Sequence, residues 1–576
     1  MSSADALSDS YTASTAFLDA LVEAGVEYIF ANLGSDHSAL IESLAAAKVT
    51  GRKVPMLITC PNEMVALSCA HGFAQASGRG QAVFVHVECG TQALAGAVHN
   101  AAKGRIPVLI FAGASPFTQE GELLGSRNEF IQWIQDVFDQ RGLLRGYVKY
   151  ENELRTGHNV KQIVHRAMQF AHSDPKGPVY LVGAREVMEQ RIECAPVDPA
   201  AFVPISPCAL PEEGVAAILA VLRTAQRPLV VTSFIGRNQR AVAPLVAFCR
   251  RHGIGVLESV PSYVNFPQDD LLYQGNHWNH PYQNEALASA DCIVVIDSDV
   301  PWIPTVSRPA ADAVIFHIDV DPLKQQMPLW YIPARQAFRA DAETALRQLL
   351  AAGDDVADAQ IGARRAHWAA LSERRGAELS AREALGADIT AEYVVARLRP
   401  WIDDKTHIVN ESITNYHTVI DHLRLTRPGA MWASGGGSLG YNGGAAIGAK
   451  LALPDRTIVA LTGDGSYMFS VPSTVHWMAR HYATPFLQVI FNNRGWKAPK
   501  FSTLALHPHG YASRANDLGT SFDPPPDYAA IAAAAGGAFA RKVIRPEEVD
   551  DALAEAFRAV REERRCAVLD VWLPHL

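Results

Sequence analysis

The segment TIVALTGDGSYMFSVPSTVHWMARHYATPFLQVIFNNRGW, residues 457–496, decides how this chain folds. An apolar run, Thr457 to Leu461, ends just before Gly463-Asp464-Gly465, and a second apolar run, Phe486 to Phe491, ends at Asn492-Asn493. Short apolar runs bounded by glycine or asparagine are typical of buried strands, and the residues between these two are helix-like. The pattern predicts two parallel strands joined by a crossover helix, which places both polar endings at one edge of a sheet.

The two polar endings have the chemistry of a site for a metal-bound diphosphate. Mg²⁺ prefers oxygen ligands, and the side chains of Asp464 and Asn493 together with the carbonyl of Gly495 offer three of them. A glycine at a strand end that opens a helix also brings backbone N–H groups close to a phosphate. Either motif alone is ordinary loop chemistry. Because both follow strands and residues 466–491 separate them, we expect a cofactor site here.

The same strand–helix rhythm extends over most of the chain. Further apolar runs that predict strands are Tyr28 to Ala31, Met56 to Thr59, Ala82 to Val87, Pro107 to Ala112, Val179 to Val182, Pro228 to Val231, Ile254 to Leu257, Ile293 to Ile296, Val314 to Ile318 and Cys566 to Trp572. A proline-rich stretch at 193–210 predicts a linker, and 351–385 predicts helix and connector. We therefore expect an α/β protein with three consecutive doubly wound parallel-sheet domains, at 1–190, 208–352 and 386–576.

Composition narrows the classes of function. Hydrophobic residues make up 48% and charged residues 19% of the 576 residues, as in a globular protein. The net charge of −9 is spread along the chain, so we expect no nucleic-acid partner. The start, MSSADALSDS, has no signal-peptide pattern, and no window approaches the roughly 18 apolar residues of a membrane span, which predicts a cytoplasmic protein without membrane contact. The eight cysteines contain no C-x-x-C pair and are predicted to be buried free thiols.

The motifs resemble the signature of thiamine-diphosphate-dependent enzymes of the acetolactate synthase, pyruvate oxidase, benzoylformate decarboxylase and 2-hydroxyacyl-CoA lyase type. In that family GDG is followed by NN after a gap of this size. The resemblance covers nearly the whole chain, because 25–34, 106–113 and 317–322 also match family segments. It implies a pyrimidine-binding, a central and a diphosphate-binding domain in that order. It also implies bound thiamine diphosphate, with Mg²⁺ held by Asp464, Asn493 and Gly495.

The resemblance assigns roles to further residues. The segment 435–441 resembles the one beneath the cofactor, where Leu439 stands at the position of the side chain that forces the two rings into a V shape. The residues expected to contact the cofactor are Thr414, Gly437, Ser438, Leu439, Gly463, Gly465, Ser466 and Trp496. The segment Cys60-Pro61-Asn62-Glu63 resembles the start of the pyrimidine-domain helix, whose glutamate activates the cofactor, so Glu63 is the predicted catalytic residue. An isolated glutamate at a helix start would instead be a dipole-stabilising residue.

Positions that choose the reaction differ from those of the named enzymes. Residues 114–130 contain no histidine and no glutamate follows NN closely, which disfavours simple pyruvate decarboxylation. Ala114 stands where acetolactate synthases carry glutamine, so acetolactate synthesis is also in doubt. His37, in the turn after the first predicted strand, is a second catalytic candidate that would relay a proton to the reacting oxygen, or it caps the next helix. Glu120, Trp496 and Lys497 are further candidates.

The resemblance favours a 2-oxoacid decarboxylase or carboligase acting on a small-molecule carbonyl substrate. The alternatives are a lyase for 2-hydroxyacyl-CoA or acyloins and a non-catalytic cofactor-binding relative. Family active sites lie between subunits, which implies a homodimer or a homotetramer. Some relatives hold FAD or ADP in the central domain, where Arg237, Asn238 and Arg240 follow a strand end and either hold a diphosphate or are simply solvated.

Overall fold

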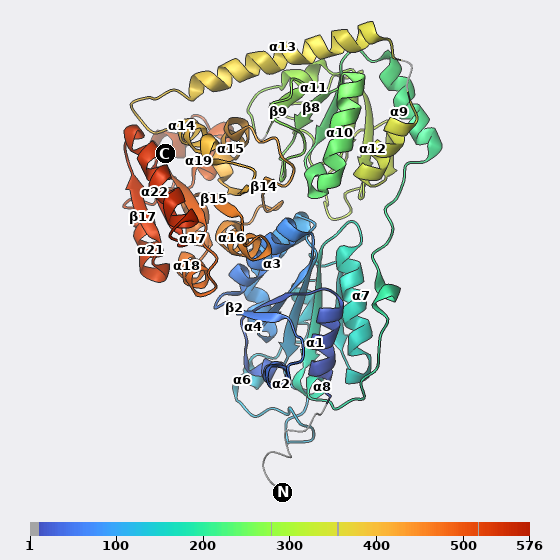
Figure 1. The fold of residues 1–576 in the computed structure, drawn as a ribbon, viewed down its shortest axis with the longest axis vertical. Coiled ribbons are helices and arrows are strands. Elements are labelled where there is room, and N and C mark those ends of the chain that lie inside the picture. Colours follow the sequence, from blue (N-terminus) through green and yellow to red (C-terminus); the bar gives the residue numbers. More distant parts are fainter. Residues whose placement is uncertain (1–10, 278, 354–355, 516–517, 576) are drawn as a thin grey trace.

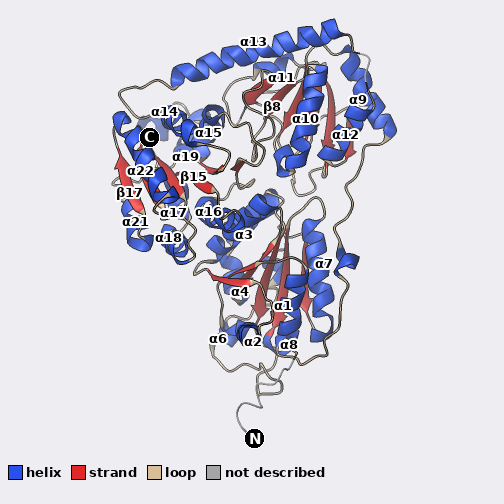
Figure 2. Cartoon of the chain, in the orientation of Figure 1, coloured by secondary structure: helices blue, strands red, loops and turns tan. Residues whose placement is uncertain are grey.

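Three parallel sheets organise the molecule. The computed structural model describes residues 11–277, 279–353, 356–515 and 518–575. Within these residues the chain forms three α/β domains in series, each built on a six-stranded sheet whose paired strands run parallel (Figures 1 and 2). The predicted fold class is confirmed. No helix in the described ranges has the length and apolar character needed to cross a membrane.

The N-terminal sheet has the strand order β2-β1-β3-β4-β6-β5. Its strands are β1 (Tyr28–Ala31), β2 (Met56–Thr59), β3 (Gln81–Val85), β4 (Val108–Ala114), β5 (Tyr150–Leu154) and β6 (Pro178–Ala184). The helices are α1 (Ala13–Glu23), α2 (Ser38–Thr50), α3 (Glu63–Ser77), α4 (Val87–Ala93), α5 (Ala95–Lys103), α6 (Ile131–Ile134), α7 (Val160–His172) and α8 (Arg185–Met188). The strand β3 ends at Val85, two residues before the end of the predicted strand, so His86 lies outside β3 although the prediction included it.

The central sheet has the order β12-β11-β10-β7-β8-β9. Its strands are β7 (Pro228–Thr232), β8 (Gly255–Glu258), β9 (Tyr273–Asn276), β10 (Cys292–Ile296), β11 (Val314–Asp319) and β12 (Gln336–Arg339). The helices are α9 (Glu212–Thr224), α10 (Gln239–His252), α11 (Glu285–Ser289) and α12 (Ala342–Ala351). The 25-residue helix α13 (Asp358–Arg382) then runs along the top of the molecule in Figure 1 and leads into the third domain, as expected for a connector.

The C-terminal sheet has the order β14-β13-β15-β16-β18-β17. Its strands are β13 (Thr406–Glu411), β14 (Met431–Trp432), β15 (Thr457–Gly463), β16 (Leu487–Asn492), β17 (Phe539–Val543) and β18 (Ala567–Trp572). The helices are α14 (Ala391–Leu398), α15 (Tyr416–Leu423), α16 (Tyr441–Ala452), α17 (Asp464–Phe469), α18 (Pro472–His481), α19 (Lys497–Leu506), α20 (Tyr511–Ala515), α21 (Tyr528–Gly536) and α22 (Val549–Arg561). Because β13, β15 and β16 are neighbours, their carboxyl ends meet at one edge.

The N- and C-terminal domains are joined through the helices α3 and α16. Glycines let the two backbones approach closely: a Cβ placed on Gly72 would lie 2.2 Å from the carbonyl oxygen of Ala445, and one on Gly448 would lie 1.9 Å from that of Cys69. Side chains of both domains share one apolar core across this contact.

Five of the eight cysteines are buried free thiols, but Cys89, Cys194 and Cys208 are exposed, so the prediction of burial is wrong for these three.

Candidate active site

A cavity of about 220 Å³ opens where β13, β15 and β16 end. Nine of the eleven residues predicted to hold cofactor and metal in the C-terminal domain line it: Thr414, Leu439, Gly463, Asp464, Gly465, Ser466, Asn493, Gly495 and Trp496. Lys497, a further candidate, lines it as well. We call this space the C-terminal cavity.

Two buried oxygen-bearing side chains meet in the C-terminal cavity. Asp464 is 2% exposed, and its carboxylate accepts hydrogen bonds from the backbone N–H groups of Gly465 and Gly495, both at 2.9 Å. Asn493 is 5% exposed, and its Oδ1 has no hydrogen-bond donor among the described residues. A buried acceptor without a partner is costly, so a bound group is expected to satisfy it. These oxygens fit Mg²⁺, which prefers carboxylate and amide ligands.

Trp496 closes one side of the cavity because the backbone turns sharply at Arg494 and Gly495, directly before it. Arg494 has φ of 60° and Gly495 has φ of 155°, so the chain turns sharply after the strand. A Cβ on Gly465 would lie 2.6 Å from Trp496 Nε1, so only glycine leaves room for this indole. Phe522 packs edge-on against Trp496 at a centroid distance of 5.0 Å. The indole is therefore held in place beside the predicted diphosphate site.

Gly437 and Ser438 lie outside this cavity. The Gly437 N–H donates to His99 Nε2 at 3.1 Å, and the Ser438 N–H donates to Asn100 Oδ1 at 3.0 Å. Both partners belong to α5 of the N-terminal domain. The 434–438 loop is thus fastened to the N-terminal domain within one chain, and Leu439 is the first residue after it that reaches the cavity.

The second half of the predicted site lies at the carboxyl ends of the N-terminal strands. Glu63 is the first residue of α3, while the helix cap is Asn62, whose Oδ1 accepts from the Val65 N–H at 3.1 Å. The Glu63 carboxylate therefore does not serve as the cap. Its Oε1 accepts a hydrogen bond of 2.7 Å from Asn32 Nδ2, at the end of β1. Glu63 is partly exposed and does not line the C-terminal cavity.

An Asp–His pair stands beside Glu63, at the end of β3. His86 Nδ1 lies 2.6 Å from Asp36 Oδ1, and His86 Nε2 lies 2.9 Å from Gln135 Oε1. Both ring nitrogens face acceptor oxygens, which favours the protonated ring. The hydrogen bond to Asp36 raises the pKa of His86, burial opposes it, and the charges of Asp36 and Glu63 add to the rise. His86 is thus a group that can hold a proton near neutral pH.

Asp36 is the ionised member of this pair and holds His86 in position. Burial alone would raise the pKa of its carboxyl, but His37 and His86 outweigh burial and hold that pKa well below its ordinary value. The other oxygen, Oδ2, accepts the Val87 N–H at 3.1 Å. Val87 has φ of 30°, a left-handed conformation that a β-branched residue rarely adopts. The Asp36 carboxylate thus fixes both the His86 ring and the strained turn that presents it.

The structure places His37 behind this pair. His37 is fully buried, its Nδ1 accepts the Gly34 N–H at 3.1 Å, and its ring stacks on Phe84 with an interplanar angle of 3°. A substrate has no access to it in this position, so we do not propose the proton relay that the sequence suggested for His37. Glu120 lies in an exposed loop and does not line the C-terminal cavity.

We expect the pH dependence of catalysis to report the Asp36–His86 pair. If His86 acts protonated, kcat/KM falls as the pH rises through its pKa. Replacing Asp36 by asparagine removes the charge and the hydrogen bond that raise this pKa, so the alkaline fall of kcat/KM should move to lower pH. Asp139→Asn, which removes an exposed carboxylate paired with Arg145, should leave the profile in place. An unchanged alkaline limb in Asp36→Asn would rule out His86 as its source.

Comparison with known proteins agrees with the geometry. Three family models match in order: the N-terminal binding domain of thiamine pyrophosphate enzymes at 11–143, the central domain at 215–349 and the C-terminal binding domain at 412–571. The chain belongs to the thiamine pyrophosphate enzyme family. The resemblance that the GDG and NN motifs carried is thereby confirmed, and the two binding-domain models span the two half-sites described above.

Relatives within the thiamine pyrophosphate enzyme family are distant. The chain is 25% identical over 506 residues to an acetolactate synthase large subunit of Parasynechococcus marenigrum, covering 83% of this chain and 75% of that protein. It is 25% identical over 590 residues to a sulfoacetaldehyde acetyltransferase of Castellaniella defragrans, covering 97% and 93%. A thiamine diphosphate-dependent 4-hydroxybenzoylformate decarboxylase of Rhodococcus jostii superposes with a TM-score of 0.77 at 20% identity, covering 98% and 99%. This last likeness shows the fold alone.

The sequence reasoning missed Asn32, His86 and Gln135. The signal for His86 was present, because a polar residue directly follows the buried run Ala82 to Val85 and sits beside the end of β1, just as Asp464 follows β15. The strand predicted at Ala82 to Val87 includes His86, so the prediction did not mark it as a residue at a strand end. Gln135 lies 49 positions further along and carries no comparable motif.

Proposed function

We propose that this protein is a 2-oxoacid decarboxylase or carboligase that uses thiamine diphosphate and Mg²⁺. The observation that carries the proposal is the presence of both half-sites in one chain. One is an acid–base group in which Glu63 lies beside the Asp36–His86 pair. The other is the C-terminal cavity, which is lined by Asp464 and by Asn493, whose Oδ1 has no partner among the described residues. The relative named as an acetolactate synthase supports this class of reaction.

Each half-site has a separate task. Asp464, Asn493 and the Gly495 carbonyl would hold Mg²⁺, and Leu439 would support the cofactor rings. When bound, thiamine diphosphate supplies the electron sink for chemistry next to a carbonyl. Glu63, held by Asn32, would hold a proton at the cofactor's aminopyrimidine. Trp496 would exclude water from one side of the cavity.

The proposed reaction breaks the bond between the carboxyl and carbonyl carbons of a 2-oxoacid. CO₂ leaves, and the electron pair stays with the former carbonyl carbon. This carbon then takes a proton, giving an aldehyde, or bonds to a second carbonyl compound, giving a hydroxyketone. His86 would supply or withdraw a proton at the reacting oxygen through Nε2, which in this structure faces Gln135 Oε1 at 2.9 Å.

The division of the site supports a homodimer or a larger assembly of dimers. Within one chain the C-terminal cavity is lined only by residues of the C-terminal domain, and Glu63 is not among them. Large apolar side chains are exposed near the N-terminal half-site, including Phe130 at 79% and Ile134 at 72%, and beside the cavity, including Phe469 at 47% and Phe501 at 54%. A second copy would cover these surfaces and bring Glu63 to the cavity of its partner.

We propose no nucleotide in the central domain. Arg237 faces Asp297 at 3.7 Å, Asn238 Nδ2 donates to Glu343 at 2.9 Å, and Arg240 also pairs with Glu343. At the carboxyl edge of the central sheet, Arg105 and Lys324 each bind both Asp299 and Asp319. The residues suggested for a diphosphate are thus bound to carboxylates, and the edge beside them is occupied by ion pairs.

The test is turnover of a substrate panel by the full protein. The protein is incubated with thiamine diphosphate and Mg²⁺ and offered 2-oxoacids, acyloins or 2-hydroxyacyl-CoA esters, and CO₂ and carbonyl products are followed by mass spectrometry. We expect CO₂ from 2-oxoacids, and loss of turnover when Mg²⁺ or thiamine diphosphate is omitted. An aldehyde or ketone formed from acyloins or acyl-CoA esters without CO₂ would replace the proposal by a lyase, and complete inactivity would favour a non-catalytic relative.

A further inference from the structure

The segment that carries Leu439 into the C-terminal cavity is held by its backbone on both sides of this residue. After Leu439, the buried carboxylate of Glu411, at the end of β13, accepts the N–H groups of Tyr441 at 3.1 Å and Asn442 at 2.9 Å. These bonds fix the start of α16 within the C-terminal domain. Before Leu439, the backbone is held by α5 of the N-terminal domain.

Asn100 of α5 binds both backbone polar groups of Ser438, the residue before Leu439. Its Nδ2 donates to the Ser438 carbonyl oxygen at 2.9 Å, and its Oδ1 accepts the Ser438 N–H at 3.0 Å. Asn100 is 2% exposed, so water competes little for these two bonds. Because the peptide units are planar and both polar groups of Ser438 are engaged by one amide, the peptides beside Ser438 cannot rotate freely. The direction in which the chain enters Leu439 is therefore set by the N-terminal domain.

The 434–438 loop lies directly against α5. A Cβ on Gly435, whose φ is 74°, would lie 2.5 Å from the Cα of Gly104 at the end of α5, so a larger residue would push the two backbones apart. The Gly437 N–H donates to His99 Nε2 at 3.1 Å. Burial lowers the pKa of His99, which keeps the ring neutral and able to accept this bond. Asn100 thus holds the loop at a packed surface between two domains.

We propose that Asn100 is a positioning residue for Leu439: by holding Ser438, it keeps the Leu439 side chain in the place that bound thiamine diphosphate requires. This inference rests on the proposed function, because it takes Leu439 as the support of the cofactor rings. A loop released from Asn100 samples other positions, and the cofactor binds only those molecules in which Leu439 is in place. The apparent dissociation constant then rises by the inverse of that fraction.

Calorimetric titration of the full protein with thiamine diphosphate, in the presence of Mg²⁺, tests this role. Asn100→Ala removes both bonds to Ser438, and we expect the dissociation constant to rise about tenfold. At saturating cofactor the loop is in place again, so kcat should stay within about threefold of the original. Asn100→Asp, which keeps the size and the acceptor but loses the donor, should also weaken binding and decides the question if Asn100→Ala does not fold. Unchanged affinity in these variants, or a lower kcat without a change in affinity, would overturn the inference.

Gln348 provides a matched control, because its side chain binds both backbone groups of Leu210 in the same way. Its Nε2 donates to the Leu210 carbonyl oxygen at 3.0 Å, and its Oε1 accepts the Leu210 N–H at 2.8 Å. This contact belongs to the central domain. Gln348→Ala should lower the unfolding midpoint about as much as Asn100→Ala does, but it should leave the affinity for thiamine diphosphate within about twofold. Equal losses of affinity in the two variants would mean that general destabilisation is the cause and would refute the positioning role.

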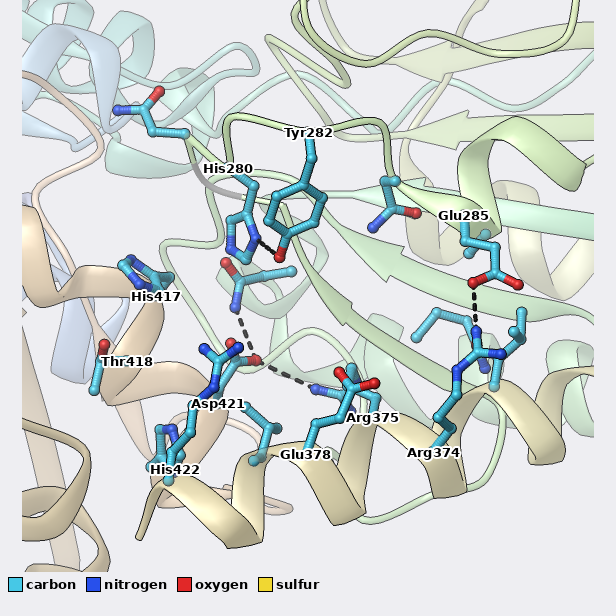
Figure 3. A pocket seen from close by; sticks show the side chains of 18 of the residues that line it. His280, Tyr282, Glu285, Arg374, Arg375, Glu378, His417, Thr418, Asp421 and His422 are labelled. Atoms are coloured by element: carbon cyan, nitrogen blue, oxygen red, sulfur yellow. Dashed lines mark hydrogen bonds and ion pairs between the residues drawn. The ribbon is translucent and has the colours of Figure 1, made fainter. Parts of the chain in front are cut away.

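A second control weakens another contact of the C-terminal domain. A cavity of about 490 Å³ lies between the central domain, α13 and α15, and in it Arg375 of α13 pairs with Asp421 of α15 at 3.3 Å (Figure 3). None of the described residues that line this space also lines the C-terminal cavity. Arg375→Gln should therefore keep the affinity for thiamine diphosphate. An effect as large as that of Asn100→Ala would show that domain contacts in general, and not the bonds to Ser438, set this affinity.

A double-mutant cycle shows whether Asn100 acts through Leu439. In the Leu439→Ala protein, Asn100→Ala should raise the dissociation constant by less than about twofold, because the side chain that it positions is absent. An undiminished effect in that background would overturn the inference. These affinities are measured without turnover: binding that depends on Asn100, in a protein inactive on all 2-oxoacids, would support the positioning role and refute the proposed function.

Discussion

Glu63→Gln is expected to lower kcat by about two to four orders of magnitude, the usual contribution of a general acid–base group. The substitution keeps the length of the side chain and the oxygen that accepts from Asn32 Nδ2, so the local geometry should survive. It removes only the ability to hold and release a proton. Because Asn62 caps α3, the loss of charge at the first helical position should cost no more than about 1 kcal/mol of stability.

Two measurements besides kcat separate this chemical role from a structural one. The thermal unfolding temperature and the affinity for thiamine diphosphate, followed by calorimetry, should stay close to those of the unsubstituted protein. Glu42→Gln, at an exposed position of α2, serves as the control and should leave all three properties unchanged. Turnover of Glu63→Gln within about threefold of the original would show that the proton is held elsewhere, with Glu88 and Asp36 as the next carboxylates to examine.

Sequence patterns located the buried strands of the fold because such strands are apolar runs. The unpredicted β5 (YENEL), β12 (QAFR) and β17 (FARKV) lie at sheet edges, and polar or charged residues interrupt any apolar run in them. The edge strand β9 (YQGN) is buried but also too polar to be recognised as an apolar run. The strand β13 was missed for another reason. It is central and fully buried, yet polar residues interrupt its apolar run. One of them, Glu411, is buried there because its carboxylate accepts the N–H groups of Tyr441 and Asn442 at the start of α16.

The C-terminal half-site was more predictable than the N-terminal one. Asp464, Asn493 and Gly495 belong to short motifs next to strand ends, so their convergence follows from the parallel sheet alone. Asp36, His86 and Gln135 converge across 100 positions of chain, and their contact depends on the strained turn at Val87 and on the loop after α6. A choice between His37 and His86 required the burial and ring contacts that only the fold defines.

Gly448→Ala, in the contact between α3 and α16, is expected to destabilise the folded protein by about 3 kcal/mol or more. Alanine is the better helix former by about 0.5–1 kcal/mol, so propensity alone predicts a gain. The new Cβ would lie 1.9 Å from the carbonyl oxygen of Cys69, however, and a backbone atom cannot rotate away as a side chain can. The helices must separate, and overpacking of this kind costs about 1–3 kcal/mol or more.

This separation would also reach the active site, because α3 begins at Glu63 and α16 begins two residues after Leu439. Urea unfolding followed by circular dichroism should therefore show a lower midpoint for Gly448→Ala, together with weaker binding of thiamine diphosphate. Gly362→Ala, in α13 with open space around its Cα, should keep or raise the midpoint. Adding Cys69→Ala should give no rescue, since the clash is with the backbone; an unchanged midpoint in Gly448→Ala would mean that the two helices do not pack this closely in solution.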